Sequence, residues 1–360
     1  MSGLLIIILV ALIFLVLYQL GRSSEMMATL QGEQEFDKKR NKWLGYSMLG
    51  VFAVLMGGIV YTHYYMLPLI EDMLIAASDH GEEYDRMFLI TLIVTGIVFF
   101  ITQFLCFYFA FRYRDNGKNK PVFFAHSNKL EMIWTTVPAL AMAILVAFGL
   151  KAWFTMTNPV PAGKDKQIIE IIGKQFNWIS RYPGKDGVIG KKYFTNINEE
   201  NNILGLDWTD PACKDDIVIP TGELRLVVGK PVELIIGSRD VIHDVGLSHF
   251  RMKMDAVPGI TTRMWFTPTI TSDSMKILTE NPDFVYELSC DQMCGKGHYS
   301  MRAVVYVQTQ ADHDKWLAEQ KTYYELGHPE EFETEETEET EGGEAAEGEE
   351  AKEEETVTMN

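Results

Sequence analysis

The sequence has 360 residues, 47% of them hydrophobic, and a formal net charge of −18 at pH 7. Residues 330–355 hold 15 glutamates and one lysine, a net charge of −14, which leaves −4 for the rest of the chain. The acidity therefore belongs to the C-terminal tail, and the chain lacks the basic field that nucleic-acid-binding proteins use. The length is enough for a membrane region and one or two compact domains.

Four long apolar runs come first along the chain. They cover residues 4–20, 43–67, 87–111 and 130–154, lengths close to the roughly 20 residues that cross a bilayer. Pro138 lies inside the fourth run, where neighbouring membrane helices tolerate a proline. A cleaved signal peptide is the alternative for the first run. That run lacks a basic leader and an Ala-x-Ala site, so we expect a retained span.

The charges between these runs predict how the chain crosses the membrane. Lysine and arginine gather in the loops predicted at residues 21–42 and 112–120, whereas residues 71–86 are acidic. Because basic loops stay on the cytoplasmic side, we expect both basic loops inside and the acidic loop outside. The N-terminus then lies outside, and the fourth span brings the chain out again at about residue 155. Everything beyond should be extracytoplasmic.

From about residue 155 the pattern changes to short β-branched and aromatic runs separated by Gly, Pro and Asp turns. Such runs are typical of an all-β sandwich or barrel. Residues 184–216, rich in turn residues, are predicted to form a long loop. Residues 311–326 are predicted to form a helix that begins at Ala311 or Asp312. The glutamate repeats after residue 328 cannot bury a core and are predicted to be disordered.

Four metal-ligating side chains lie within twelve residues near the end of this region. The segment YELSCDQMCGKGHYSMRAVV contains Cys290, Cys294, His298 and Met301, and another strand-like run ends at His243. Thiols, imidazoles and a thioether suit a soft, redox-active metal, and copper is the first choice. A mononuclear blue-copper site needs only one cysteine, so this set fits two copper ions bridged by two thiolates better.

Spacing separates this interpretation from other cysteine sites. Cys-x3-Cys-x3-His differs from the Cys-x-x-Cys-His of covalent haem attachment. Zinc usually takes a second Cys or His pair and does not use methionine. Two alternatives stay open. A mononuclear copper site would leave one cysteine idle, and a disulfide between Cys290 and Cys294 would leave both histidines and the methionine without a role.

Together these motifs resemble subunit II of haem-copper cytochrome c oxidases, the subunit that holds the binuclear copper A centre. The likeness runs from about residue 88 to 317 and includes HSNKLEMIWTTVPAL, GKQFNW, DVIHDVGL, KMDAVPG and CDQMCGKGHYSM, in that order. It implies an α+β membrane protein in which transmembrane helices precede an all-β, cupredoxin-type Greek-key sandwich. The family's helical hairpin corresponds to the third and fourth spans, so the first two spans are additional.

The resemblance also implies a domain order and a location. We expect two additional helices in residues 1–70, the helical hairpin in 71–154, the copper domain in 155–327 and an acidic disordered tail in 328–360. The copper domain is expected on the periplasmic side of a bacterial inner membrane, in which the chain is a multi-pass protein.

Carried over position by position, the resemblance assigns the copper ligands. Cys290 and Cys294 would bridge the two ions, His243 and His298 would each bind one, and Met301 would be a weak ligand. Gln292 stands where the family usually has glutamate, and the ligand at that position is the main-chain carbonyl. The family glutamate also joins a magnesium site shared with subunit I. An amide is a poorer ligand for a hard cation, so magnesium is in doubt, although the neighbouring Asp291 is a substitute.

The resemblance assigns further residues to electron transfer and docking. Phe176 stands where the family has the tryptophan that receives electrons, and Trp178 is the only indole in that motif. We therefore predict Trp178 and Phe176 as the residues where electrons arrive, with a core aromatic as the alternative for Trp178. Asp240 and Asp255 match acidic positions around the copper site and are predicted to dock cytochrome c. Solvated turn carboxylates are the alternative.

Glu131 matches a family glutamate near the mouth of a proton path into subunit I. A structural role competes with this assignment. Asn128, three residues earlier, would form a capping box with Glu131, and an acid suits the first turn of a helix.

The resemblance implies an electron-accepting subunit of an aerobic terminal oxidase, and hence part of an enzyme, cytochrome-c oxidase. Electrons would pass from cytochrome c, soluble or held in a partner respiratory complex, through copper to haem in subunit I. That partner would reduce oxygen to water and translocate protons. This chain would bind no haem and no nucleic acid, and would contact subunit I, other oxidase subunits and the lipid bilayer. The alternative is a membrane-tethered copper carrier or assembly protein.

Overall fold

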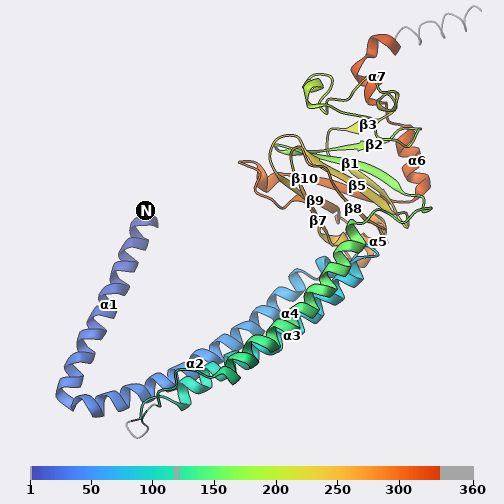
Figure 1. Cartoon of the computed structure of the whole chain (residues 1–360). Coiled ribbons are helices and arrows are strands. Elements are labelled where there is room, and N and C mark those ends of the chain that lie inside the picture. The colour runs from blue at the N-terminus through green and yellow to red at the C-terminus, as the bar shows by residue number, and fades with distance from the viewer. Residues whose placement is uncertain (1, 117–119, 121, 333–360) are drawn as a thin grey trace, which may run out of the picture. The chain divides into compact units, whose positions relative to one another are not determined.

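The computed structural model describes residues 2–116, 120 and 122–332, so the predicted disordered tail lies almost wholly outside the described residues. Contacts group the chain into two units (Figure 1). A helical unit contains residues up to 71 together with 88–145. A β unit contains residues 72–87 together with those from 146 onward.

Among the described residues, four helices are long and apolar enough to cross a membrane, as the sequence predicted. They are α1 (Ser2–Gln31), α2 (Glu33–Met66), α3 (Gly81–Arg112) and α4 (Asn128–Thr157). Within the helical unit, α2 packs on α3 through aromatic contacts of Phe52 with Phe104 and Phe107. Gly45 of α2 is buried, and a Cβ there would lie 2.7 Å from Cδ of Arg114, so this glycine permits the close approach.

The prediction of a loop at residues 21–42 is wrong. α1 continues to Gln31 and α2 begins at Glu33, so only Gly32, with φ +83°, interrupts the helices. Polar sequence does not end a helix, because the backbone hydrogen bonds form within the helix whatever its surroundings. Two acids in the first turn of α2, Glu33 and Glu35, also favour a helix start there.

The β unit is a sandwich of two five-stranded sheets, which confirms the predicted order of four spans followed by a β-sandwich. The first sheet has the order β3-β2-β1-β5-β8, with strands Ile217–Ile219, Asn177–Tyr182, Gln167–Lys174, Val232–Ser238 and Thr262–Phe266. The second has the order β4-β10-β9-β6-β7, with strands Leu224–Val227, Arg302–Gln308, Tyr286–Cys290, His243–Leu247 and Met252–Ala256. The β1–β5 and β4–β10 pairs are parallel, and the other pairs are antiparallel.

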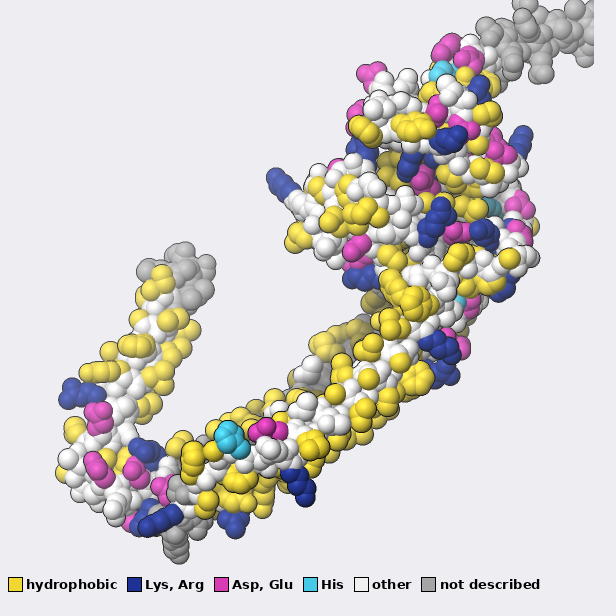
Figure 2. Space-filling model, viewed as in Figure 1, with side chains coloured by type: hydrophobic (Ala, Val, Ile, Leu, Met, Phe, Trp, Pro, Cys, Tyr) yellow, Lys and Arg dark blue, Asp and Glu magenta, His cyan; other side chains and the backbone are white. Residues whose placement is uncertain are grey.

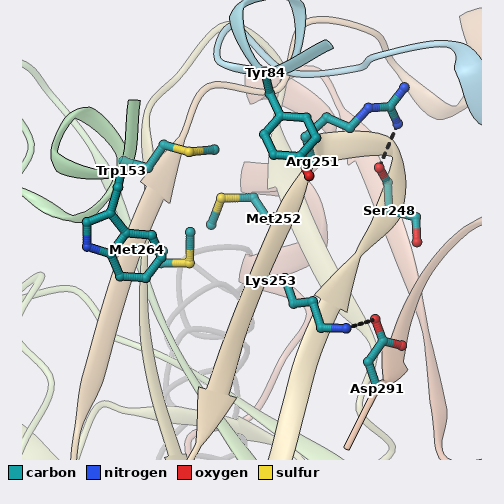
Figure 3. Close-up of a pocket in the computed structure, with 9 residues that line it drawn as sticks. Tyr84, Trp153, Ser248, Arg251, Met252, Lys253, Met264 and Asp291 are labelled. Carbon is teal, nitrogen blue, oxygen red and sulfur yellow. Dashed lines mark hydrogen bonds and ion pairs between the residues drawn. The ribbon is translucent and has the colours of Figure 1, made fainter. Parts of the chain in front are cut away.

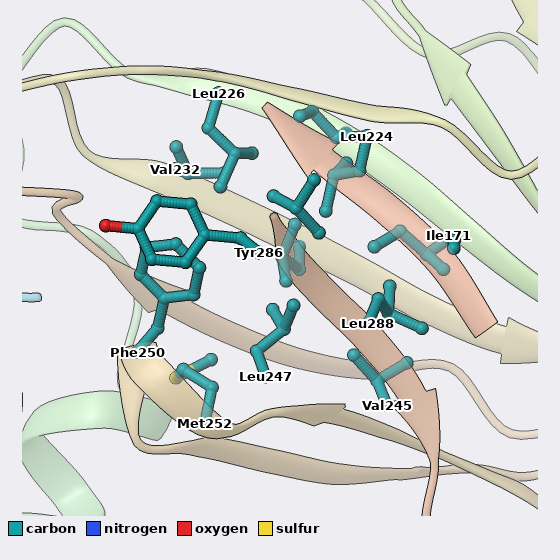
Figure 4. Close-up of a cluster of buried hydrophobic side chains, with 14 of the residues drawn as sticks. Ile171, Leu224, Leu226, Val232, Val245, Leu247, Phe250, Met252, Tyr286 and Leu288 are labelled. Carbon is teal, nitrogen blue, oxygen red and sulfur yellow. The ribbon is translucent and has the colours of Figure 1, made fainter. Parts of the chain in front are cut away.

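The hydrophobic core lies between the two sheets (Figure 4). In β10 alternate residues are buried, so Ala303, Val305 and Val307 face inward. Period-two alternation of this kind is what a strand with one buried face requires. Among the core side chains are Ile171, Leu224, Leu226, Val232, Val245, Leu247, Phe250, Met252, Tyr286 and Leu288.

A chain segment before α3 also belongs to the β unit. The N–H of Ala77 donates to the carbonyl of His249 (2.7 Å), and the N–H of Asp79 donates to the carbonyl of Thr267 (3.1 Å). These bonds join the N-terminal end of α3 to the sandwich.

The short helices before residue 310 are η1 Leu67–Leu69, η2 Asp72–Leu74, η3 Phe194–Asn196, η4 Pro211–Cys213, η5 Ser248–Phe250, η6 His298–Ser300 and α5 Ser272–Leu278.

The long excursion predicted at residues 184–216 has no regular strand among its residues, and it has its own small core. Leu204, Leu206 and Cys213 are buried there. Arg181, on β2, is completely buried and pairs with Glu170 (3.1 Å) and with Asp216. A buried guanidinium needs such partners, because an unpaired charge in the interior is strongly destabilising.

The single helix predicted for residues 311–326 is two helices. α6 spans Gln310–Ala318 and is capped by Thr309, whose side chain accepts a hydrogen bond from the N–H of Asp312. α7 spans Tyr323–Gly327 and is capped by Thr322 in the same way. The second threonine cap offers the backbone a new helix start, which breaks the continuous helix.

Candidate metal centre

Strand alternation places the first cysteine on the inner face of the sandwich. Tyr286, Leu288 and Cys290 are the buried residues of β9, so the Cys290 thiol points into the core. The neighbouring strand β6 begins at His243, which is completely buried. Because β6 pairs with β9 in the register Val245 to Cys290, the histidine and the thiol lie at the same end of the sheet.

The structure brings all five predicted side-chain ligands together. The sulfurs of Cys290 and Cys294 lie 3.8 Å apart. Nδ1 of His243 is 3.8 Å from Sγ of Cys290, and Nδ1 of His298 is 3.6 Å from Sγ of Cys294. Sδ of Met301 is 3.8 Å from Sγ of Cys294. Two sulfurs thus form the middle of the cluster, with one imidazole on each side.

The main-chain carbonyl of Gln292 is also part of the cluster. This carbonyl oxygen lies 3.2 Å from Sγ of Cys290, whereas the side chain of Gln292 is exposed. The arrangement therefore presents the carbonyl to the sulfurs, and the amide side chain takes no part.

The donor set fits a soft metal and a closed site. Both cysteines are free and buried, so the disulfide alternative is not what the structure contains. Burial, together with the adjacent Cys290, raises the pKa of the Cys294 thiol to about 11. Two neighbouring thiolates repel each other, so a bound cation is needed to hold both of them deprotonated. Thiolate, thioether and imidazole ligands together suit copper.

Asp240 fixes the orientation of the buried histidine. Its Oδ1 accepts a hydrogen bond from Nε2 of His243 at 2.8 Å. A carboxylate only accepts, so Nε2 carries the proton and Nδ1 keeps a lone pair directed toward Cys290. Burial of Asp240 raises its pKa, but the backbone N–H of Gln175, the ring of His243 and the N–H of Val241 outweigh this, and its pKa lies below the usual value. Asp240 thus orients one of the predicted ligands, a role that its place in the sequence did not indicate.

A glycine in β1 makes room for the same imidazole. A Cβ at Gly173 would lie 2.7 Å from Cδ2 and 2.9 Å from Cγ of His243. A glycine inside a strand pattern indicates a close approach of another group. Gly173, the first residue of the GKQFNW motif, is therefore the sequence signal from which this contact could have been found.

The turn between β1 and β2 (Asn177–Tyr182) holds the ligand loop in place. Nε2 of Gln175 donates to the main-chain carbonyl of Cys294 at 2.6 Å. The ring of Phe176 lies against Gly295 and Gly297, where a Cβ would come within 3.1 Å and 2.5 Å of ring atoms. Larger residues at these two glycines would push the loop away from the ring.

The two predicted electron-receiving residues occupy different environments. Trp178 is 0% exposed, and its ring centroid lies 5.9 Å from that of His243 in an edge-on arrangement. Phe176 is 39% exposed. Of this pair only Phe176 reaches the surface, whereas Trp178 packs against His243 inside the core.

The other predicted acids lie elsewhere. Asp255 is exposed on β7, where it pairs in register with the buried Asp244 of β6. Lys253 lies between Asp244 (3.4 Å) and Asp291 (3.3 Å). Burial raises the pKa of Asp244, and this charge pattern leaves an excess of carboxylates on that side of the sandwich.

A cavity of about 420 Å³ opens beside these residues in the β unit (Figure 3). Trp153, Met252 and Met264 form its apolar side. On its polar side Arg251 pairs with Asp85 and Lys253 pairs with Asp291, so both cations already have acidic partners. None of the clustered sulfur or imidazole groups lines this cavity, so it is separate from the candidate metal centre.

Glu131 belongs to the helical unit and lies exposed in the first turn of α4. The predicted capping box with Asn128 is wrong, because the helix already includes Asn128. Ser127 precedes the helix, and its Oγ and carbonyl accept from the N–H groups of Leu130 (3.4 Å) and Glu131 (2.9 Å). The side chain of Glu131 is therefore not needed for a cap.

Comparison with known proteins shows which family this chain is similar to. Residues 69–152 match the model of the transmembrane domain of cytochrome c oxidase subunit II, and residues 167–308 match the model of its periplasmic domain. The alternative cytochrome c oxidase subunit 2 of Bradyrhizobium diazoefficiens is 36% identical over 234 residues, which cover 65% of this chain and 79% of that protein.

Two further proteins are similar at lower sequence identity. Cytochrome c oxidase subunit 2 of Thermostichus vulcanus is 26% identical over 289 residues, covering 74% of this chain and 82% of the relative. The crystal structure of the periplasmic domain of cytochrome oxidase subunit II from Bradyrhizobium japonicum is 23% identical and covers 44% of this chain and 95% of its own, with a TM-score of 0.29.

Proposed function

Because this chain belongs to the cytochrome c oxidase subunit II family, we propose that it holds the binuclear copper centre through which electrons from a cytochrome c reach haem in subunit I. The family is part of an enzyme, cytochrome c oxidase, and its members are anchored in the membrane with an extracytoplasmic domain. In this proposal the membrane is the bacterial inner membrane, and subunit I carries out oxygen reduction and proton translocation.

The observation that carries the proposal is the cluster of two cysteine sulfurs, 3.8 Å apart, between two Nδ1 atoms. We assign Cys290 and Cys294 as bridging ligands, His243 and His298 as one ligand each, and Met301 as a weak ligand. The carbonyl of Gln292 is the sixth group. Two bridged copper ions would supply a shared, delocalised electron whose gain or loss requires little rearrangement.

Three residues around the cluster hold its side chains in place. Asp240 orients His243 from behind, Gln175 holds the Cys294 carbonyl, and Trp178 closes the inner side. In this proposal six protein groups surround the two ions, so no open coordination position would remain for a substrate, in contrast to a catalytic metal. This arrangement suits electron relay.

Electrons would arrive at Phe176, the exposed member of the predicted pair, and reach the cluster through the loop on which its ring packs. Glu131, in the first turn of α4, remains our proposal for a residue at the mouth of a proton path. Magnesium binding beside Gln292 would rest on Asp291, which is already paired with Lys253. We propose residues 1–70 for the two additional helices and residues 328–360 for the acidic tail, and we assign no role to either.

The test is Cys290→Ser in the full-length chain within the purified oxidase complex. We expect loss of the copper signal and of electron transfer from cytochrome c to haem, while subunit I still co-purifies. Cys106→Ser is the matched control, because Cys106 lies exposed on α3 in the helical unit and should change neither property. Haem reduction at the normal rate in Cys290→Ser would contradict the proposal. Loss of copper delivery to another protein, with haem reduction intact, would favour the copper-carrier alternative.

A further inference from the structure

A tight turn within the long excursion of residues 184–216 has a fixed shape. Asn198 and Asn202 exchange two main-chain hydrogen bonds, at 3.0 and 2.9 Å. The side chain of Asn202 is buried, where it accepts from the N–H of Leu206 at 2.7 Å and donates to the carbonyl of Leu206 at 3.0 Å. Glu199 lies inside this turn, so its backbone is held in a defined position.

Glu199 binds two cations at the ends of neighbouring strands. Its carboxylate accepts from Nζ of Lys174 at 2.7 Å and from the guanidinium of Arg239. The strands β1 and β5 are parallel and their last paired residues are Gly173 and Ser238, so each cation comes directly after a paired residue. Hydrogen bonds from these two cations hold the pKa of Glu199 below its usual value. One carboxylate thus offsets two like charges at adjacent strand ends.

The residues that follow these two cations hold the metal centre. Gln175 comes after the lysine, and its Nε2 donates to the carbonyl of Cys294 at 2.6 Å. Asp240 comes after the arginine, and its Oδ1 accepts from Nε2 of His243 at 2.8 Å. These two residues are also joined to each other, because the N–H of Gln175 donates to Oδ2 of Asp240 at 2.7 Å. The contacts with two ligand residues and the contacts with Glu199 therefore lie on the same two stretches of chain.

A backbone hydrogen bond couples these two stretches beneath Glu199. The N–H of Arg239 donates to the carbonyl of Gly173 at 2.9 Å. Gly173 is the residue whose backbone leaves room for the ring of His243. An outward movement of Arg239 would therefore displace both the strand that packs on the imidazole and the carboxylate of Asp240 that orients it.

An ion pair on the surface does not by itself indicate a functional contact. Charged side chains of both signs are interspersed over the face of the β unit in Figure 2, and exposed pairs contribute little to stability. The side chain of Glu199 is 61% exposed, so we expect little effect of this contact on the free energy of unfolding. The side chain of Arg239 is only 13% exposed, which leaves it little freedom to find another partner. The position of the contact, and not its strength, is what points to a role.

We propose that Glu199 is a positioning residue for the copper centre. It holds Lys174 and Arg239 together, and with them the two stretches of chain that fix His243 and the ligand loop. This role rests on the proposed function, because the residues that it positions are the proposed copper ligands. Without the carboxylate the two cations would repel each other and separate the ends of β1 and β5. The imidazole would then take more than one position relative to the sulfurs.

The first test follows the metal-free, full-length protein by hydrogen–deuterium exchange. Glu199→Gln keeps the length of the side chain and removes its charge. We expect amide exchange in residues 173–176 and 239–243 to become about three- to tenfold faster, because these stretches open more easily. Glu200→Gln removes the same charge at the next, equally exposed position and should leave both stretches unchanged. Equal exchange rates in the two variants would overturn the inference.

The second test follows copper in the full-length protein without an electron donor. Glu199→Gln should lower copper affinity by about two- to tenfold in a chelator competition, less than the loss expected for a direct partner of a ligand. Its electron paramagnetic resonance lines should broaden, whereas Glu200→Gln should match the wild type. A wild type without a copper signal would overturn the proposed function and this inference with it. An intact wild-type signal that is unchanged in Glu199→Gln would overturn only the inference.

The third test separates position from charge. Glu199→Asp keeps the charge but is shorter by one methylene group, so we expect it to bind one of the two cations and not both. Faster exchange and broadened copper lines in Glu199→Asp would support the positioning role. Wild-type behaviour of Glu199→Asp would show that only the charge matters and would overturn the inference.

Discussion

Replacing Gly173 by alanine should disturb the metal centre while leaving the sandwich folded. The added methyl group would lie 2.7 Å from Cδ2 and 2.9 Å from Cγ of His243. Ordinary van der Waals contact begins at 3.4 Å, so the ring or strand β1 must move by about 0.7 Å. The ring cannot yield freely, because it is completely buried and its Nε2 is bonded to Asp240 at 2.8 Å.

Overpacking of this kind costs about 1–3 kcal/mol. We expect the free energy of unfolding of Gly173→Ala to fall by an amount within this range, and the affinity for copper to fall with it because Nδ1 of His243 is displaced. The assay is copper content and the copper absorption spectrum of the full-length protein, together with a denaturant titration. Gly237→Ala is the matched control. Gly237 lies on the neighbouring strand β5, its Cβ would meet only Cδ1 of Ile172 at 3.3 Å, and it has no contact with His243.

Two results would refute this reasoning. If Gly173→Ala keeps its copper spectrum and its stability, His243 does not lie against β1 as described. If Gly237→Ala loses copper to the same extent, the effect belongs to the sheet in general and says nothing about the imidazole.

Three further substitutions test other contacts in the β unit. Asp240→Ala removes the acceptor of the Nε2 proton of His243 and should lower copper affinity by about 10–100-fold in a chelator competition; unchanged affinity would contradict the positioning role. Arg181→Met leaves Asp216 buried without its cation and should lower the free energy of unfolding by about 3–5 kcal/mol in a urea titration, and a loss below about 1 kcal/mol would refute the importance of the buried pair. Gln292→Ala should leave copper content unchanged because only the main-chain carbonyl faces the sulfurs, so copper loss would show that the amide side chain takes part.

Much of the architecture could be read from the sequence because its signals are local. The four apolar runs and the short β-branched runs each have a length or period that defines one kind of element. The ligand set could be proposed because Cys290, Cys294, His298 and Met301 lie close together in the sequence. The structure adds that His243 reaches them through the pairing of β6 with β9.

Other features depend on contacts between distant residues, and sequence patterns do not reveal these. Asp240 was predicted to dock a partner protein, which stays a prediction, and the structure adds its hydrogen bonds to His243 and to the N–H of Gln175. The burial of Trp178 depends on the packing of two sheets. The break between α6 and α7 has a local cause, the cap at Thr322. The aromatic and apolar residues on both sides of Thr322 nevertheless follow helical spacing, so the sequence pattern predicted one continuous helix.

The most direct test of the binuclear centre is to load the full-length protein with copper, determine copper per chain and record the electron paramagnetic resonance spectrum. We expect two copper ions per chain that share one unpaired electron, with hyperfine structure from both nuclei. A single copper ion per chain, with the hyperfine pattern of one nucleus, would contradict the bridging roles of Cys290 and Cys294 and leave a mononuclear site in their place.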